Sequence, residues 1–314
     1  MYPPRPVPPS PPPRPALARP TLAALALLAA LAAPAAAQDK ADTLRADDGW
    51  RSSLVAQFQG NQAAYSNWQE GGVDALAATA SAEGTFDRVV GRLLVSQTAR
   101  LAFGVLRQDT LDLRKAVDVI RYGVTAETAS SQAFRPFLGL SLRTQFADGF
   151  DYDPEPGEYP SLDVVPGREV RVSTFAAPLV LTQSAGVAYR PGGGFVARTG
   201  LALKETVVSV RRLRPVHGNG LDEPVRTEVG LDLETVFERD VMENVRLRSR
   251  LTAFQGFGAI GEQAPDVLFE NGLVLKVNDL LNVTIDTSAL YDRDVSADLQ
   301  LRETVALGVT FDLL

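Results

Sequence analysis

The segment "LQLRETVALGVTFDLL", residues 299–314, alternates between two kinds of side chain. Its odd-numbered positions are apolar apart from Glu303, and its even-numbered positions are polar or small up to residue 312. Successive side chains of an extended strand point to opposite faces, so this period of two predicts one long strand with one apolar face. We expect Val309 and Phe311 on that apolar face and Thr310 on the other.

The same alternation recurs along most of the chain, and no helical period competes with it. The segment "ENVRLRSRLTAF", for example, alternates Arg246, Arg248 and Arg250 with Val245, Leu247 and Leu251. Alternation is poor around residues 117–124, which predicts a bulge or register shift there. The pattern predicts about twelve strands, near residues 52–64, 72–84, 86–106, 112–126, 132–147, 174–190, 194–210, 224–238, 244–257, 265–278, 280–292 and 299–313.

The connections between these strands also alternate. Short turns are predicted at "AEGT", "RPGGG", "ERDVME" and "VNDLL". Longer links are predicted at "RQDTLDLR", "ADGFDYDPEPGEYPSLDVVPG", "RRLRPVHGNGLDEP", "GFGAIGEQAP" and "DRDVSAD". If the strands run up and down, every long link lies at one rim and every short turn at the other, an asymmetry typical of outer-membrane barrels.

Two fold classes fit this pattern. One is an all-β, antiparallel, up-and-down transmembrane β-barrel of about twelve strands, and the other is a soluble β-sandwich or calycin-like barrel. Many of the strands exceed the 9–11 residues that a tilted membrane strand needs, whereas soluble strands are usually about five or six residues long. Strand length and the rows of arginines beside carboxylates favour the membrane barrel.

A membrane barrel of this kind has a polar lumen. The predicted strands 224–238 and 244–257 form a hairpin, which is expected to bring Asp232 and Glu234 across from the region of Arg248 and Arg250 on one face. The candidates for lining the lumen are Arg88, Arg92, Arg100, Glu228, Asp232, Glu234, Arg246, Arg248, Arg250 and Arg302.

The start of the chain has the features of a secretory signal peptide. A proline-rich lead with Arg5, Arg14 and Arg19 is followed by the apolar run "TLAALALLAALA" and by "APAAAQ", which predicts cleavage after about Ala37. A retained membrane anchor is the alternative. The predicted organisation is a signal peptide at 1–37, an N-terminal segment at 38–50 and a barrel domain at 51–314 of an exported outer-membrane protein.

Composition excludes several classes of function. The 37-residue leader holds three of the 31 Lys and Arg residues and none of the 38 Asp and Glu residues, so the mature net charge is 28 minus 38, or −10. That charge disfavours nucleic-acid binding. There is no cysteine, which excludes disulfides and thiolate chemistry.

The sequence offers little for catalysis. His217 is the only histidine and lies in the link "RPVHGNGLDEP", so we expect a solvated loop residue, no catalytic residues, no enzyme activity and no cofactor. No metal site is predicted, although an acidic link forms a weak calcium candidate. Its carboxylates are Asp148, Asp151, Asp153 and Glu155.

Two loops are candidates for contact with the membrane. Arg211, Arg212 and Arg214 could bind phosphates of lipopolysaccharide, and a plain exposed loop fits equally well. The loop "YSNWQEGG" is interpreted as a rim loop in which Trp68 anchors at the membrane surface; a binding role for Ser66–Gly72 stays open.

Several separated motifs resemble one family. They are "YSNWQEGG", "LRKAVDVIRYG", "TQFADGFDYD", "STFAAPLVLTQSAGVAYRP", "RDVMENVRLRSRLTAF" and "ALYDRD", in that order. The chain resembles domain-of-unknown-function family 3078 over most of residues 50–313. The resemblance implies an exported outer-membrane β-barrel-like protein of Gram-negative bacteria, without an established activity. The chain departs from the aromatic ending of many barrels because it ends on Leu314, and Phe311 is the nearest aromatic residue.

The sequence supports two classes of function for such a barrel. The first is a narrow pore or solute channel. The alternative is a structural or envelope-anchoring barrel with a lumen plugged by salt bridges, or else a soluble periplasmic binding barrel. Outer-membrane lipid is the expected partner, and the sequence predicts neither a solute nor an oligomeric state.

Overall fold

The computed structural model describes residues 50–64, 73–109, 111–259, 264–293 and 298–314. The predicted signal peptide at 1–37, most of the segment at 38–50 and Trp68 with its loop lie outside the described residues. Among the described residues, no helix is long and apolar enough to serve as a membrane span. The strands are β1 Trp50–Ala63, β2 Ala75–Val90, β3 Leu93–Gln108, β4 Arg114–Thr128, β5 Phe134–Thr144, β6 Gly149–Asp151, β7 Val170–Ser173, β8 Leu179–Gly192, β9 Phe195–Val207, β10 Val225–Met242, β11 Val245–Gly256, β12 Asp266–Lys276, β13 Leu281–Tyr291 and β14 Gln300–Asp312.

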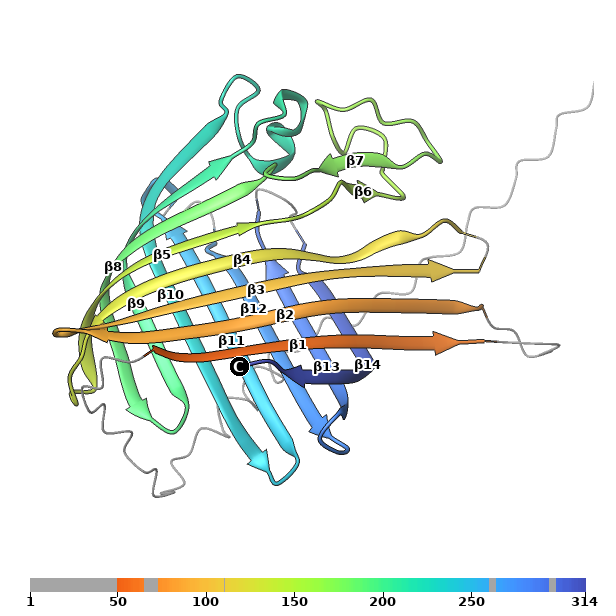
Figure 1. Ribbon diagram of the computed structural model, residues 1–314. Coiled ribbons are helices and arrows are strands. Elements are labelled where there is room, and N and C mark those ends of the chain that lie inside the picture. The colour runs from red at the N-terminus through yellow and green to blue at the C-terminus, as the bar shows by residue number, and fades with distance from the viewer. Residues whose placement is uncertain (1–49, 65–72, 110, 260–263, 294–297) are drawn as a thin grey trace, which may run out of the picture. The chain divides into compact units, whose positions relative to one another are not determined.

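Twelve of these strands form one closed antiparallel barrel, so the predicted fold class is confirmed. Each strand pairs with the next along the chain, with β5 pairing directly with β8 because β6 and β7 form a separate hairpin (Figure 1). The ring closes where β1 pairs with β14, from Val55 opposite Asp312 to Gly60 opposite Leu307. The seam pairs part of each strand, and closing the ring in this way is the condition for a sheet to span a membrane.

The predicted difference between the two rims is present. One rim carries the short connections at 91–92, 129–133, 193–194, 243–244 and 277–280, and the other carries those at 64–74, 109–113, 145–178, 208–224, 257–265 and 292–299. The turn predicted at "AEGT" is wrong. Strand β2 continues through Gly84 to Val90, and the turn to β3 lies at Gly91 and Arg92.

The irregularity predicted around residues 117–124 is confirmed close to its expected place. Gly104 of β3 pairs with Val117 of β4, while the next residue, Val105, pairs with Lys115. Ala116 is therefore the extra residue of a bulge, which interrupts the period of two and explains the poor alternation.

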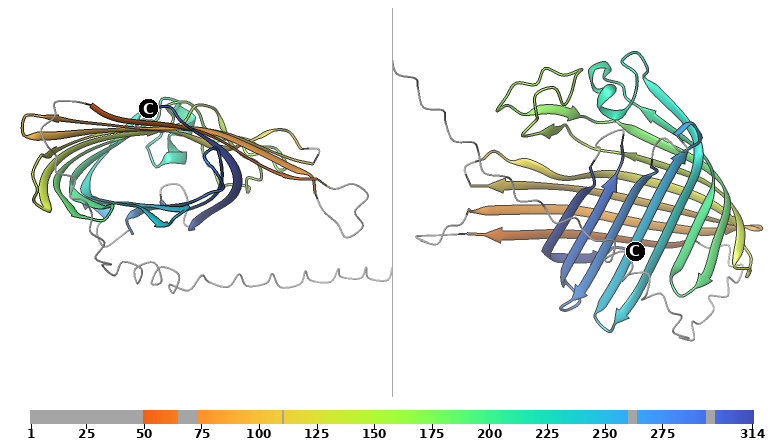
Figure 2. Two further views of the ribbon diagram at one scale, coloured as in Figure 1. Left: turned by 60° about the horizontal axis from the view of Figure 1, so that its bottom comes forward. Right: turned by 180° about the vertical axis from the view of Figure 1, so that it is seen from behind.

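Contacts across the ring identify the inner and outer faces. Arg121 of β4 contacts Glu270 of β12, and these strands are six places apart in a ring of twelve, so both side chains point into the barrel. Figure 2 shows β1 to β3 along one wall and β11 and β12 along the facing wall. The strand register extends this assignment to every neighbouring residue.

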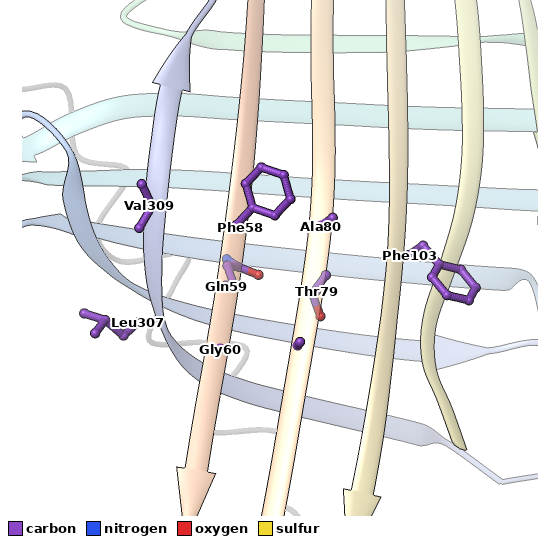
Figure 3. Close-up of a pocket in the computed structure, with 9 residues that line it drawn as sticks. Phe58, Gln59, Gly60, Thr79, Ala80, Phe103, Leu307 and Val309 are labelled. Atoms are coloured by element: carbon purple, nitrogen blue, oxygen red, sulfur yellow. The ribbon is translucent and has the colours of Figure 1, made fainter. Parts of the chain in front are cut away.

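The outer face is apolar and exposed. It includes Phe58, Leu138, Leu201 and Leu307, which are 57%, 65%, 59% and 57% exposed. On β14, Phe311 shares this face, while Thr310 accepts a hydrogen bond from the inward-facing Asn282 at 2.6 Å, as the alternation predicted. A shallow groove of about 410 Å³ crosses β14 and β1 to β3 (Figure 3). The groove is lined by Phe58, Gln59, Gly60, Ala78, Thr79, Ala80, Phe103, Leu307 and Val309.

The two longest links pack against each other beyond the long-link rim. Ala177, Val208 and Leu213 are fully buried and form a small core, against which Leu162 and Val210 pack. The link at 208–224 contains the 3₁₀-helices η1 Arg211–Leu213 and η2 Pro215–His217, and η3 Phe257–Ala259 follows β11. These short helices and the β6–β7 hairpin are features that the sequence pattern did not predict.

Candidate functional site

The candidate functional site is the lumen of the barrel. Inward-facing basic and acidic side chains form ion pairs across it at several levels. The most direct crossing joins Arg121 to Glu270. Arg121 Nη1 donates to Glu270 Oε2 at 2.8 Å, and Nη2 lies 3.3 Å from Oε1. Both side chains are largely buried, with 17% and 20% exposure. The bidentate pair therefore ties together the two strands that lie opposite each other in the ring.

A second crossing joins β11 to β2, which are five places apart in the ring. Arg248 contacts Glu83 of β2, and Arg100 of β3 lies 3.3 Å from the same carboxylate. Arg248 also donates to both oxygens of Glu238 at 3.2 Å. Glu83 is thus held by two guanidinium groups that reach it from opposite walls.

The inward-facing ion pairs of the barrel are called the lattice below. Glu127 is its most deeply buried member. Its side chain is 1% exposed and accepts hydrogen bonds from Arg190 Nε at 2.6 Å and from Arg198 Nε at 2.9 Å. Arg198 also bonds Glu234 at 3.0 Å, and Glu234 lies 3.5 Å from Arg250. This chain of contacts links β4, β8, β9, β10 and β11 without interruption.

A third group lies toward the long-link rim. Lys204 Nζ of β9 bonds Asp266 of β12 at 2.6 Å and lies 3.4 Å from Glu228. Arg226 contacts Glu228 at 3.1 Å. The ammonium group also lies 4.9 Å from the ring centre of Phe254, a cation–π distance.

Neutral polar side chains fill the inner face at β1, β13 and β14. Gln57 donates to Asn282 at 3.0 Å, and Gln59 donates to Thr284 at 2.7 Å. Asn282 and Thr284 are each 3% exposed. These bonds skip a strand, because β14 lies between β1 and β13, so they hold the closure of the ring from within.

Most of the predicted lumen residues lie on the inner face. Arg100, Glu228, Asp232, Glu234, Arg248, Arg250 and Arg302 are on it, and Arg302 donates to Ser288 at 3.2 Å. Arg246 shares the face but lies at its end, where it pairs with Asp240 at 2.8 Å and is 45% exposed.

The hairpin formed by β10 and β11 is present, and Glu234 lies 3.5 Å from Arg250 as expected, but Asp232 is displaced from that region. Asp232 lies opposite Phe254, and the residues directly opposite Arg248 and Arg246 are Glu238 and Asp240. The long strand β10 extends to Met242, so the turn begins later than the sequence suggested, and the pairing shifts with it.

Arg88 and Arg92 are not part of the lumen. Arg88 lies directly opposite Trp50, and its guanidinium carbon is 5.5 Å from the Trp50 ring centre on the outer face. Arg92 belongs to the turn at 91–92 and is exposed. The two-residue turn pairs Val90 with Leu93, so inward residues are odd-numbered on β2 and even-numbered on β3. The prediction assigned even-numbered residues to the lumen on both strands.

About half of the charged residues in the lumen were not predicted from the sequence. Applying the alternation to every strand separately would have found these residues, because each occupies the polar face of its own strand. The missed members are Glu83, Arg121, Glu127, Arg190, Arg198, Lys204, Asp266 and Glu270.

The acidic link uses its carboxylates internally. Asp148 pairs with Arg171 at 3.0 Å, and hydrogen bonds from Thr174 and Arg171 lower the pKa of Asp148. Asp151 accepts a hydrogen bond from the Tyr159 hydroxyl at 3.0 Å, while burial and this carboxylate raise the pKa of Tyr159. Within the ranges that the structure describes, no group of three His, Asp or Glu side chains could hold a metal ion.

The three arginines predicted to bind phosphate lie in the link at 208–224, and their surroundings differ. Arg214 donates to Val208 O at 3.1 Å and to Leu221 O at 3.0 Å, so it shapes the loop. Arg211 pairs with Asp222 at 2.8 Å. Arg212 is exposed and lines a shallow surface pocket of about 470 Å³ with Pro160.

His217 is half-buried and not fully solvated as expected. Its Nε2 lies 3.1 Å from Val172 O, which joins the 208–224 link to β7, and burial lowers the pKa of His217. The residue therefore has a structural contact within the loops.

Comparisons with solved structures find barrels at low similarity. The translocator domain of autotransporter NalP from Neisseria meningitidis shares 10% identity, with 84% of this chain and 88% of that chain covered and a TM-score of 0.33. An outer membrane channel from Pseudomonas putida F1 shares 12% identity, with coverage of 82% and 93% and a TM-score of 0.34. The toluene transporter TodX from Pseudomonas putida shares 9% identity, with coverage of 84% and 89% and a TM-score of 0.28.

No curated protein matches the chain. A family match covers the part of the barrel from the end of β1 to β6. Residues 60–150 match the model of the family described as Protein of unknown function (DUF3078), which confirms the predicted resemblance to that family over this segment.

Proposed function

We propose that this chain is an outer-membrane barrel whose lumen is closed by its own ion pairs, and that it serves a structural or envelope-anchoring role. The location is supported by the outer face, where large apolar side chains such as Leu138 and Leu301 are 65% and 64% exposed. A band of this kind is stable in lipid and promotes aggregation in water.

The observation that carries the proposed role is the bidentate contact between Arg121 and Glu270. It joins opposite strands, so the two side chains together span the lumen at that level. The crossing from Arg248 to Glu83 lies beside it and spans a second path. A permeating ion would have to separate these partners and leave each one partly buried and unpaired, which is costly.

The paired state of the lattice also argues against a selectivity filter. A filter binds permeating ions weakly through groups that are free to exchange partners. Here Glu127 and Glu83 are each held by two arginines, and Lys204 is held by Asp266 and Glu228. These three groups are satisfied by partners within the lumen, which suits a plug.

Conductance in planar bilayers tests the proposal. The mature wild-type protein is expected to show no steady conductance, and R121A/E270A combined with R248A/E83A is expected to open a measurable one. The reversed pair R121E/E270R should stay closed because it restores the crossing with opposite polarity.

The matched control is R211A/D222A, which removes an exposed ion pair from a link and should leave conductance unchanged. Heat-modifiable gel migration of each variant shows that the barrel has assembled. Steady wild-type conductance would replace the plug with the channel hypothesis. A closed quadruple variant that has assembled would show that the lattice does not close the lumen.

A further inference from the structure

Three arginines lie side by side on the inner face of neighbouring strands. Arg100 of β3 is directly opposite Arg121 of β4, and Arg121 is directly opposite Arg143 of β5. Directly opposite residues point to the same face of a sheet, so Arg143 points into the barrel as Arg121 does. Like charges in direct opposition destabilise a sheet, and anionic partners remove that cost.

Two of these three arginines have a carboxylate partner. Arg100 lies 3.3 Å from Glu83, and Arg121 forms the bidentate pair with Glu270. The guanidinium group of Arg143 forms neither a hydrogen bond nor an ion pair with any described residue. The charge of Arg143 is therefore left without a direct partner inside the barrel.

A second guanidinium group without a carboxylate partner lies near Arg143. Arg302 of β14 is one of the charged groups that act on Arg143. It is directly opposite Ser288, which is directly opposite Glu270, so Arg302 also points inward. Among the described residues, its side chain bonds only the Ser288 hydroxyl, at 3.2 Å. Arg143 and Arg302 thus share one region of the lumen, and neither forms an ion pair there.

The nearby carboxylates have other contacts. Asp292 acts on Arg143 without forming an ion pair with it, and Asp292 has a separate interaction of its own. Asp286 acts on Arg302 in the same indirect way and is hydrogen-bonded to Gln59. The described part of the chain therefore supplies no anion that bonds either arginine directly.

Water reaches both arginines although they point inward. Arg143 and Arg302 are each exposed. Arg143 is the penultimate residue of β5 and Arg302 is the third residue of β14, so both lie at the long-link ends of their strands. A small solute can therefore approach them from the long-link rim.

We propose that Arg143 and Arg302 bind a small free oxyanion, a phosphate or a carboxylate, inside the long-link end of the lumen. A planar guanidinium group presents paired N–H donors that match the oxygens of these anions. The Ser288 hydroxyl accepts a hydrogen bond from Arg302, so its own proton is available to the same anion. The inference rests on the proposed closed lumen, because the crossing from Arg121 to Glu270 then retains the anion at this end.

Calorimetric titration of the folded mature protein in non-ionic detergent tests the site. Inorganic phosphate and acetate are titrated separately, in chloride buffer at constant ionic strength. At least one of them is expected to saturate a single site, and the anion that does so identifies the class of ligand. R143Q/R302Q should bind that anion about tenfold more weakly or worse, because charge-assisted hydrogen bonds are lost.

The matched control is R92Q/R107Q, which removes the same charge from two exposed arginines outside the lumen and should leave binding unchanged. Heat-modifiable gel migration shows that each variant has assembled. A wild type that binds neither anion would overturn the proposal. Wild-type affinity in R143Q/R302Q, or an equal loss in R92Q/R107Q, would overturn it as well.

Conductance in planar bilayers is measured separately, which distinguishes the two proposals. Saturable binding in a protein that conducts would refute the closed lumen and support the oxyanion site. A wild type that neither conducts nor binds would refute the oxyanion site and leave the closed lumen standing.

Discussion

At the scale of single residues, burial decides how much each ion pair contributes to stability. Glu127 is 1% exposed and is held by Arg190 and Arg198. Removing its charge leaves two guanidinium groups without their shared carboxylate. Breaking a buried pair by removing one partner typically costs about 3–5 kcal/mol, whereas an exposed pair contributes about 0–1 kcal/mol.

We therefore predict that E127Q lowers the free energy of unfolding by about 3–5 kcal/mol. The control is D222N, which removes a carboxylate that is 83% exposed and pairs with Arg211; it should cost less than about 1 kcal/mol. Urea titration of the folded protein in detergent, followed by tryptophan fluorescence, measures both. Equal losses would mean that the Glu127 site is open to water.

The sequence could place such residues on a face but could not name their partners. Arg121 and Glu127 are both odd-numbered, so alternation along β4 puts them on the same face. Nothing in their spacing indicates that Arg121 contacts β12 and that Glu127 contacts β8 and β9. Partners across a lumen depend on how the ring closes and flattens. Only contacts between adjacent strands follow from the strand register. Even in the hairpin of β10 and β11, the predicted position of Asp232 differs from the observed one, which is opposite Phe254.

At the scale of strands, alternation was the reliable signal and turn residues were less so. The pair Glu83 and Gly84 resembles a turn, but Gly84 pairs with Leu54 on one side and with Ala99 on the other. Continuous pairing with both neighbours outweighs a local turn preference. Because the strand continues past Gly84, Arg88 belongs to β2. Even-numbered residues of β2 face outward, so Arg88 lies on the outer face and not in the lumen.

The two faces of β14 give a direct test of orientation. Leu307 is 57% exposed on the outer face, and Thr304 is on the inner face opposite Asp286. We predict that L307R costs about 2–4 kcal/mol, as for a basic residue near the bilayer midplane. T304R should cost less, because its guanidinium can pair with Asp286. Unfolding titrations in lipid vesicles compare the two, and the reverse order would mean that the faces are inverted.

At the scale of the whole molecule, closure of the ring links strand pairing to membrane location. The seam between β1 and β14 is the last pairing the chain can make, because its two strands are the first and the last. Side chains reinforce it from inside, through the bonds from Gln57 to Asn282 and from Gln59 to Thr284. A closed barrel offers detergent less free edge at which strands can begin to separate than an open sheet does.

The wild-type protein is therefore expected in the outer-membrane fraction, where it should resist extraction by urea and migrate faster in detergent gels before heating than after. V309P should abolish the fast-migrating form. Val309 lies opposite Phe58 of β1 and Leu281 of β13, and proline removes a backbone donor from a strand that pairs on both sides. V309A keeps the donor and the outward position, so it should keep the fast-migrating form. A wild-type protein recovered as a soluble periplasmic monomer would contradict the membrane barrel. A V309P protein that still migrates fast would show that the seam does not determine closure.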